Sequence, residues 1–401
     1  MSSTPPDTVS APADSAPPLE AADKGYRYGV LALLILVYTF NFIDRQIIGI
    51  LAGPIKEELN LTDTQLGWMG GLAFALFYTG LGIPIAWLAD RLSRVWIMTV
   101  SLAVWSGFTA LCGLTNSFWQ LFLARMGVGV GEAGGVAPAY SLISDYFPPK
   151  ERARAMAVYS FGIPIGSALG ILFGGLLASL VDWRFAFIAV GLAGVLIAPV
   201  FRLLVKDPPR GQYDPKPEPG SPAAKAAPIG VVLSTILPKP SFWLISFGAS
   251  CSSILGYGLI FWLPSFFQRS FGLSLVDRSL FMAGIIFIGG IIGIWIGGML
   301  GDKLGGKHKG AYALIPAVAF VLSIPCYAFG LLSESLVVAF FVFLVPQALG
   351  LVWLGPVITA IQHLGPANMR ATASALFLFI NNLIGIGFGT VFFGMLSDYL
   401  A

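Results

Sequence analysis

Four ionisable residues lie inside stretches of sequence that are otherwise apolar enough to cross a membrane: Asp44, Arg45, Arg125 and Glu132. A charge near the middle of a bilayer costs roughly 2.5–3.5 kcal/mol on insertion scales, so such residues are usually kept where they line a cavity, meet a partner or move a proton. No ionisable residue lies equally deep in the second half of the chain. These four residues are therefore the first candidates for a functional site.

The carboxylates and the arginines have different expected roles. Asp44 and Glu132 are candidate proton-coupling groups, because burial and a neighbouring arginine act on a carboxylate in opposite directions. Arg45 and Arg125 are candidate charge partners, or holders of an anionic substrate head, since a guanidinium fits carboxylate and phosphate geometry. The alternative is a static cluster that neutralises itself and only stabilises the first half of the chain.

Depth along the segments predicts how the four residues pair. Neighbours on a helix do not face each other, which argues against an Asp44–Arg45 pair. Counted from the outer ends of their segments, Arg125 and Asp44 lie about 10 and 15 Å deep, and Glu132 lies about 21 Å deep. We therefore expect Asp44 to pair with Arg125 and Glu132 to be the more isolated carboxylate.

The composition defines the class of protein. Hydrophobic residues make up 56% of the 401 residues and charged residues 11%, against about 25% charged residues in a soluble domain. An all-α, multi-pass integral membrane protein is expected, and no feature indicates a catalytic triad, an ATP-hydrolysing domain, a cofactor or a metal site. Windows of about 20 apolar residues give eleven segments: 28–52, 67–88, 95–114, 118–146, 153–180, 185–205, 242–267, 280–300, 311–332, 336–361 and 371–400.

Polar stretches divide the chain into parts. Residues 1–27 read as a disordered cytoplasmic tail, and residues 206–240, rich in proline and charge, read as a cytoplasmic linker. The linker separates a first six-helix bundle, 28–205, from a second bundle, 241–401, with helices 7 to 11. A twelfth segment is needed for six helices in each half, so we expect this sequence to lack the natural protein's last helix.

The two halves resemble repeats of each other, which is common in transporters. The sequence AWLADRLSR at 86–94 returns as GMLGDKLGGK at 298–307, and ERARAMA at 151–157 is similar to MRATASA at 369–375. The second apolar segment of each half is preceded by a helix-capping pattern, which is Thr62 with Gln65 in the first half and Ser274 with Asp277 in the second. The buried charges do not recur, because the repeat carries Arg45 to about Tyr257 and Glu132 to about Gly350. If the first half is specialised for function, its buried charges should be absent from the second half, as they are here.

Charges at the cytoplasmic ends of the repeats are candidates for a gate. Asp90, Arg91 and Arg94 follow the second segment, their counterpart recurs from Asp302, and Asp145 lies at the end of the fourth segment. These residues could form a charge latch that holds one half against the other on the cytoplasmic side in one state. The alternative is a set of ordinary loop charges that fixes the topology.

At these residues the chain resembles the major facilitator superfamily. The loop signature between helices 2 and 3 is carried by Ala86, Asp90, Arg91 and Arg94, and the helix 4 signature starts at Arg125. Within the superfamily, NFIDRQ at 41–46 and the glycine-rich run at 125–148 are similar to the spinster group. The resemblance implies the major facilitator fold of two six-helix bundles around a cavity lined by helices 1, 4, 7 and 10. The group is associated with proton-linked movement of sphingolipids and lysophospholipids.

Helices 7 and 10 bring aromatic and aliphatic residues instead of charges to such a cavity. Tyr257, Phe261, Trp262 and Trp353 are candidate contacts for an apolar substrate tail, unless they pack against lipid or neighbouring helices. A proton-coupled carrier of a lipid-like amphiphile, working by alternating access, is the expected function. The alternatives are a proton-linked carrier of a small organic anion and a non-transporting receptor or scramblase.

The distribution of basic residues predicts the orientation. If the N-terminus is cytoplasmic, most of the 23 Lys and Arg residues lie in cytoplasmic segments, as the positive-inside rule requires. The expected location is the inner membrane of a bacterium. The expected partners are the substrate, protons and membrane lipids, with a monomeric protein and no nucleic acid.

Overall fold

The computed structural model describes residues 24–89, 91–213, 228–305, 307–365 and 369–400. Within these ranges the chain is helical with short connections and has no strand. Most of the expected tail and the centre of the expected linker lie outside the described residues. The first helix begins at Lys24, so the expected tail boundary at residue 27 is placed one turn too late.

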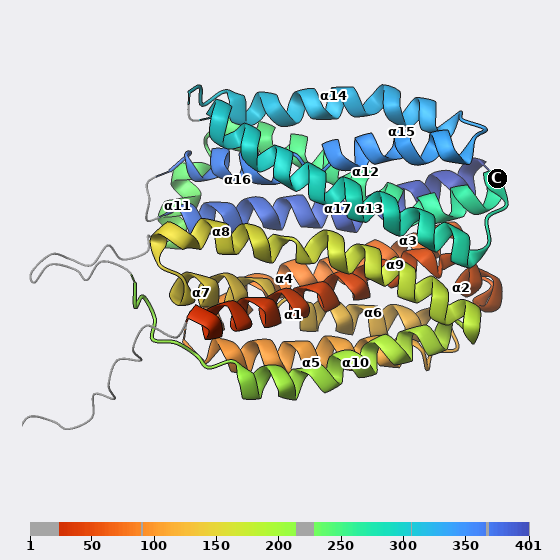
Figure 1. Cartoon of the computed structure of the whole chain (residues 1–401), viewed down its shortest axis with the longest axis horizontal. Coiled ribbons are helices and arrows are strands. Elements are labelled where there is room, and N and C mark those ends of the chain that lie inside the picture. The colour runs from red at the N-terminus through yellow and green to blue at the C-terminus, as the bar shows by residue number, and fades with distance from the viewer. Residues whose placement is uncertain (1–23, 90, 214–227, 306, 366–368, 401) are drawn as a thin grey trace, which may run out of the picture.

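The helices of the two halves run side by side (Figure 1). The first half contains α1 (Lys24–Ile50), α2 (Ala52–Leu59), α3 (Asp63–Gly67), the π-helical turn η1 (Trp68–Leu72), α4 (Ala73–Ala89), α5 (Arg94–Cys112), α6 (Phe118–Glu132), α7 (Val136–Tyr146), α8 (Pro149–Ser160), α9 (Gly162–Leu180) and α10 (Trp183–Leu204). The second half contains α11 (Ile229–Ile236), α12 (Pro240–Phe271), α13 (Leu275–Leu300), the π-helical turn η2 (Gly301–Gly305), α14 (Ala311–Leu331), α15 (Leu336–Leu349), α16 (Leu354–Gln362) and α17 (Arg370–Leu400). α11 is a short helix inside the expected linker.

Ten helices in the described part of the chain are long and apolar enough to cross a membrane. The expected segment 118–146 is not one of them, and it is broken between α6 and α7. After Glu132, the amides of Gly134 and Gly135 bond to carbonyls three residues back, which tightens the last turn of α6. The expected segment 336–361 is broken in the same way between α15 and α16, from Gly350. Gly350 is the repeat counterpart of Glu132, so both halves share this break.

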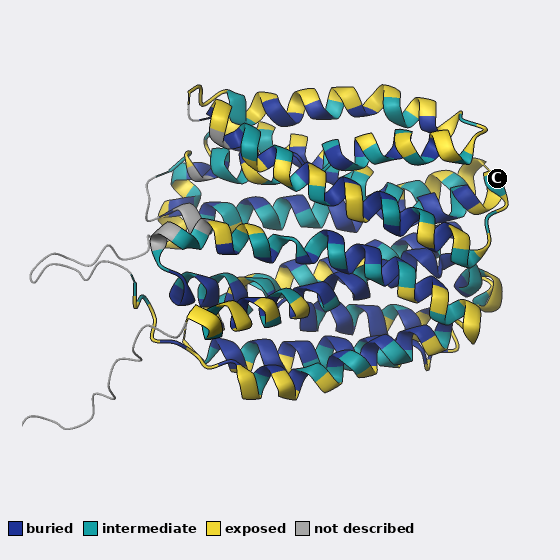
Figure 2. Ribbon diagram, in the orientation of Figure 1, coloured by how far each residue is buried: buried dark blue, intermediate teal, exposed yellow. Residues whose placement is uncertain are grey.

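We call the end of the bundle with α2 and α3 the α3 end, and the end with α8, α11 and α16 the linker end (Figure 1). Apolar side chains are exposed on peripheral helices such as α14, whereas buried residues concentrate inside the bundle (Figure 2). Leu314, Val321 and Leu332 are examples of exposed apolar side chains on or at the end of α14. This distribution is expected of a protein whose periphery faces lipid.

The two halves pack tightly where α17 meets α3 and η1, and where α9 meets α13. Small residues allow this approach: a Cβ on Gly67 would lie 2.6 Å from the Thr390 carbonyl oxygen, and one on Gly71 would lie 2.4 Å from that of Ile386. A Cβ on Gly175 of α9 would collide with Ser279 of α13. Such glycine contacts bring helix backbones together in membranes.

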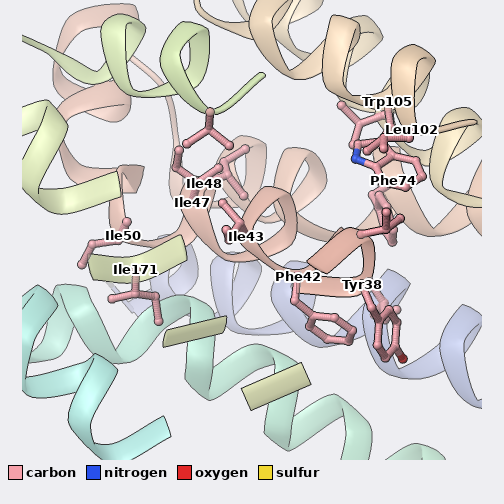
Figure 3. Close-up of a cluster of buried hydrophobic side chains, with 14 of the residues drawn as sticks. Tyr38, Phe42, Ile43, Ile47, Ile48, Ile50, Phe74, Leu102, Trp105 and Ile171 are labelled. Carbon is pink, nitrogen blue, oxygen red and sulfur yellow. The ribbon is translucent and has the colours of Figure 1, made fainter. Parts of the chain in front are cut away.

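The apolar cores show that this packing is restricted to one end. The largest cluster contains first-half residues such as Phe42, Phe74 and Trp105 (Figure 3). It also contains second-half residues near the α3 end, such as Phe267. At the linker end, a separate cluster built around Phe377 contains buried residues of α11, α12, α16 and α17 and none from the first half. The described part of the chain is therefore closed at the α3 end, with no shared core at the linker end.

Polar groups reinforce the closed end. The Asp398 carboxylate of α17 accepts hydrogen bonds from the backbone amides of Asp63 (3.0 Å) and Thr64 (2.8 Å), and from the Thr64 hydroxyl (2.5 Å). Ser397 donates to the Asp63 carboxylate at 2.7 Å. Thr62 forms the expected capping box with Gln65, and Asp398 adds a second cap to α3 from the other half of the chain.

The expected caps are formed in both repeats. The Ser274 hydroxyl accepts from the Asp277 amide at 3.2 Å and so caps α13. It also donates to the Asp277 carboxylate at 2.6 Å.

We predict that Asp398→Ala opens the α3 end. The substitution removes a cap worth roughly 0.5–2 kcal/mol, and this cap joins the two halves of the chain. Spin labels at residues 60 and 334, both exposed at the α3 end, should report longer distances in the variant. Asp182→Ala removes the cap of α10 within the first half and should leave the distances unchanged. An equal effect of the two substitutions would contradict the prediction.

Candidate functional site

The centre of the site is an ion pair between α1 and the last residue of α6. Arg45 Nε donates to Glu132 Oε2 at 2.7 Å, and the two side chains are 8% and 0% exposed. Glu132 was expected to be the isolated carboxylate, and this expectation is wrong. Side chains lean toward the N-terminus of their helix. Because α1 and α6 run in opposite directions, Arg45 and Glu132 lean toward each other.

The same geometry separates the pair that was expected. Asp44 leans toward the linker end and Arg125 toward the α3 end, so Arg125 Nη1 reaches only the Asp44 backbone carbonyl, at 3.1 Å. The Asp44 side chain is buried, and neither carboxylate oxygen accepts a hydrogen bond of normal geometry from the described residues. The side chains of Trp105 and Thr109 are the donors that lie close to it. Nε of Arg125 and the side-chain amide of Asn41 also lack partners there. The predicted Asp44–Arg125 ion pair is therefore wrong, and Asp44 is the isolated carboxylate.

Aromatic rings surround the guanidinium of Arg45. Its Cζ lies 5.0 Å from the ring centroid of Phe42, 4.8 Å from that of Phe74 and 4.5 Å from that of Tyr78. The ring of Phe74 also lies 5.9 Å from Cζ of Arg125. At these distances, cation–π attraction stabilises the two guanidinium groups in their positions. With its faces covered, Arg45 can bind an anion only along its edge, where Nη2 has no partner.

A cavity connects the two arginines with the second half of the chain. It is small and is lined by Arg45, Gln46, Gly70, Phe74, Arg125, Tyr257, Phe261, Ile386 and Thr390. The structure thus brings both candidate head-binding arginines together with two of the four candidate tail residues, Tyr257 and Phe261. Tyr257 is the repeat counterpart of Arg45, and the two face the same cavity.

Sequence reasoning missed the cavity residues of helices 2 and 11. Gly70 and Phe74 come from η1 and α4, and Ile386 and Thr390 come from α17. These helices were not expected to line the central path. One signal in the sequence was the Gly70–Gly71 pair, which permits close packing. In the structure, a Cβ on Gly70 would lie 2.3 Å from the Phe261 ring. Another signal was Gln46, a polar residue in an apolar segment.

The two candidate tryptophans lie elsewhere. Trp262 lines a different cavity at the α3 end, and its indole nitrogen donates to the Thr390 carbonyl at 3.0 Å. Trp353 is buried at the linker end, with its ring centroid 6.2 Å from that of Phe377. The apolar wall of the central cavity is therefore shorter than the sequence suggested.

The candidate gate residues are organised within the first half. Arg94 is buried and pairs with Asp145 and, at 2.8 Å, with Asp207 at the start of the linker. Arg91, in the turn after α4, donates to the Trp87 carbonyl of α4 at 3.2 Å. Asp90 and the side chain of Asp302 lie outside the described residues. Among the described residues no gate ion pair joins the two halves, so the expected latch is not closed by Arg91, Arg94 or Asp145 here.

The chain is similar to known membrane transporters over almost its whole length. The sequence profile of the Major Facilitator Superfamily matches residues 34–390. A protein described as an MFS-type efflux pump, from Mycolicibacterium smegmatis, is 34% identical over 93% of this chain and 85% of its own length. Spinster homolog 1 of Xenopus tropicalis is 27% identical over 94% of this chain and 74% of its own length.

A solved structure is similar as well. A bacterial homologue of the human lysosomal transporter spinster, in an inward-facing and unoccupied conformation, superposes with a TM-score of 0.85. It is 36% identical and is matched over 94% of this chain and 84% of its own. Its inward-facing and occupied conformation gives a TM-score of 0.82. By the profile match and these similarities, the chain belongs to the Major Facilitator Superfamily, as a multi-pass, spinster-like secondary transporter and not an enzyme.

Proposed function

We propose that the protein transports an anionic amphiphile in a proton-coupled manner, by alternating access. One observation supports this most directly. The Glu132 carboxylate pairs with Arg45, and Arg45 lines a cavity together with Arg125. A substrate anion and Glu132 therefore compete for the same guanidinium.

This competition provides coupling. Protonation of Glu132 removes the charge that holds Arg45 and frees the guanidinium for an anion. An anion at Arg45 in turn removes the charge that stabilises the Glu132 carboxylate. Anion binding and proton binding then favour each other, and the effect is reciprocal by linkage. We assign Asp44 as a second proton carrier, because a buried carboxylate that accepts no hydrogen bond of normal geometry is costly in its charged form.

Two observations bear on the substrate. Phe74, Phe261 and Ile386 give the cavity an apolar wall beside the two arginines, which suits a charged head joined to an apolar tail, and spinster proteins are among the relatives. Because Trp262 and Trp353 do not line this cavity, the wall is short. That second observation favours the alternative, a proton-linked carrier of a small organic anion.

We propose an orientation from the basic residues. With the linker end in the cytoplasm, as the positive-inside rule favours, the closed α3 end faces outward and the end without a shared core faces the cytoplasm. We further propose that residues 28–205 and 241–401 are the two units that rock in a bacterial inner membrane. The charges from Asp90 to Arg94 would then meet those near Asp302 when the linker end closes.

Glu132→Gln should separate anion binding from proton binding. The neutral amide keeps the side-chain shape but no longer competes as a charge, so Arg45 is free at every pH. Anion binding should become independent of pH between 5 and 8 and be no weaker than wild-type binding at its best pH. Transport into proteoliposomes should lose the part of its dependence on a pH gradient that Glu132 carries, and Asp44 would carry the rest. The control is Glu151→Gln, near the linker end on α8. Wild-type pH dependence of binding in Glu132→Gln would count against the coupling.

Single-chain lipids should stabilise the purified protein if the substrate is an amphiphile. Arg125→Ala removes a charge-assisted contact worth about 1.5–3 kcal/mol, so the apparent affinity for a lysophospholipid should fall by roughly 10- to 100-fold. Arg154→Ala, on the exposed side of α8, should leave the affinity unchanged. The measurement is the thermal shift across a lipid titration. Stabilisation by short organic acids, with no response to any lysophospholipid or sphingoid base, would favour the small-anion alternative.

A further inference from the structure

A second cavity opens at the α3 end, separate from the central one. Its lining residues include Gly53 and Lys56 of α2, Asp63 of α3, and Gln268 and Arg269 of α12. Both halves of the chain therefore contribute to its walls. The function proposed above does not use this cavity.

A buried arginine lies directly behind the cavity wall. Arg278, in the first turn of α13, is 4% exposed. Its Nη1 donates to the side-chain oxygen of Gln268, whereas its Nε has no partner, and no carboxylate of the described residues lies within ion-pair distance. The Glu57 carboxylate of α2 stabilises this charge electrostatically, from beyond ion-pair distance. A buried guanidinium without a directly paired carboxylate is costly, so an anion in contact with Arg278 would lower the cost of its burial.

Gly53 leaves access from the cavity to this charge. A Cβ at residue 53 would lie 3.4 Å from the Gln268 side-chain oxygen and 3.7 Å from Arg278 Nη2. Because glycine has no side chain, no such atom separates the guanidinium from the cavity. The gap lies between α2 of the first half and α12 and α13 of the second half.

The charges around the cavity are balanced in number but not in pairs. Lys56 Nζ lies 2.5 Å from Asp63 Oδ1, and Arg269 Nη2 lies 3.8 Å from Asp63 Oδ2. Glu57 on α2 is an exposed carboxylate that also lines the cavity, and the neighbouring Asp398 carboxylate caps α3. Two cations therefore share Asp63, and Arg278 is left without a carboxylate at ion-pair distance among the described residues.

We propose that this cavity is a binding site for an anion carrying a phosphate or carboxylate group, with Arg278 as its principal ligand and Lys56 and Arg269 at its rim. Bidentate binding to a guanidinium suits either group. An anion held there contacts both halves of the chain. It neutralises Arg278 only while α2 and α13 lie together, so it stabilises the arrangement that is closed at the α3 end. A phosphate of a lipid head group and a phosphate free in solution would bind the guanidinium in the same way.

The test uses the full-length protein and two probes. In detergent, inorganic phosphate is titrated against chloride at constant ionic strength, and the apparent Tm is followed. In nanodiscs, phosphatidylglycerol is compared with phosphatidylcholine, and the distance between labels at residues 60 and 334 is measured. The wild type should show a saturable rise in Tm, or a shift toward the closed distance, and Arg278→Gln should weaken the response at least tenfold. A response to only one probe identifies the source of the phosphate.

Two further variants make the result decisive. Gly53→Val fills the gap without removing a charge, so it should abolish the response even if Arg278→Gln does not fold. Arg184→Gln removes an arginine that pairs with Glu58 away from this cavity, and it should respond like the wild type. No response of the wild type to either probe would overturn the proposal. A wild-type response in Arg278→Gln, or in Gly53→Val where the former does not fold, would overturn it as well.

Discussion

The ion pair between Arg45 and Glu132 is the constraint on which the rest of the site depends. Burying two charges costs several kcal/mol per ion, and removing one partner leaves a cost of about 3–5 kcal/mol. The pair is therefore kept only where its neighbours support it. Phe42, Phe74 and Tyr78 cover the guanidinium, and the break after Glu132 places its carboxylate at the end of α6. An interaction that is strong but easily neutralised by one proton is suited to switching.

The sequence was sufficient to predict the scaffold but not the pairing. Repeats, caps and apolar segments are local properties, and Thr62 and Ser274 cap their helices as expected. Pairing depends on the direction in which each side chain leaves its helix. The sequence analysis counted only depth along the segments and ignored that direction. It therefore predicted Glu132 as the isolated carboxylate, whereas in the structure this residue is Asp44. The contribution of η1, α4 and α17 to the cavity depends on how the halves pack, which no local pattern encodes.

The repeat comparison explains why only one half is charged. Arg125 corresponds to Phe343, which is buried in an aromatic cluster with Phe266, Phe267 and Tyr327. In the second half this position therefore stabilises packing, whereas in the first half it holds a charge beside the cavity. Arg45 corresponds to Tyr257, which still faces the cavity. The two halves share one scaffold in which the same positions serve either packing or polar contacts.

Closure and the central cavity share a residue. Phe261 lines the cavity with Arg45 and Arg125, and its ring also packs against Gly70 of η1 and Gly49 of α1, where an added Cβ would lie 2.3 and 3.4 Å away. The ring therefore contacts the first half only while the α3 end is closed. If the α3 end opens, Phe261 must leave these glycines, and the cavity wall beside the arginines changes with it. Occupancy of the cavity and opening of the α3 end are thus linked through one aromatic side chain.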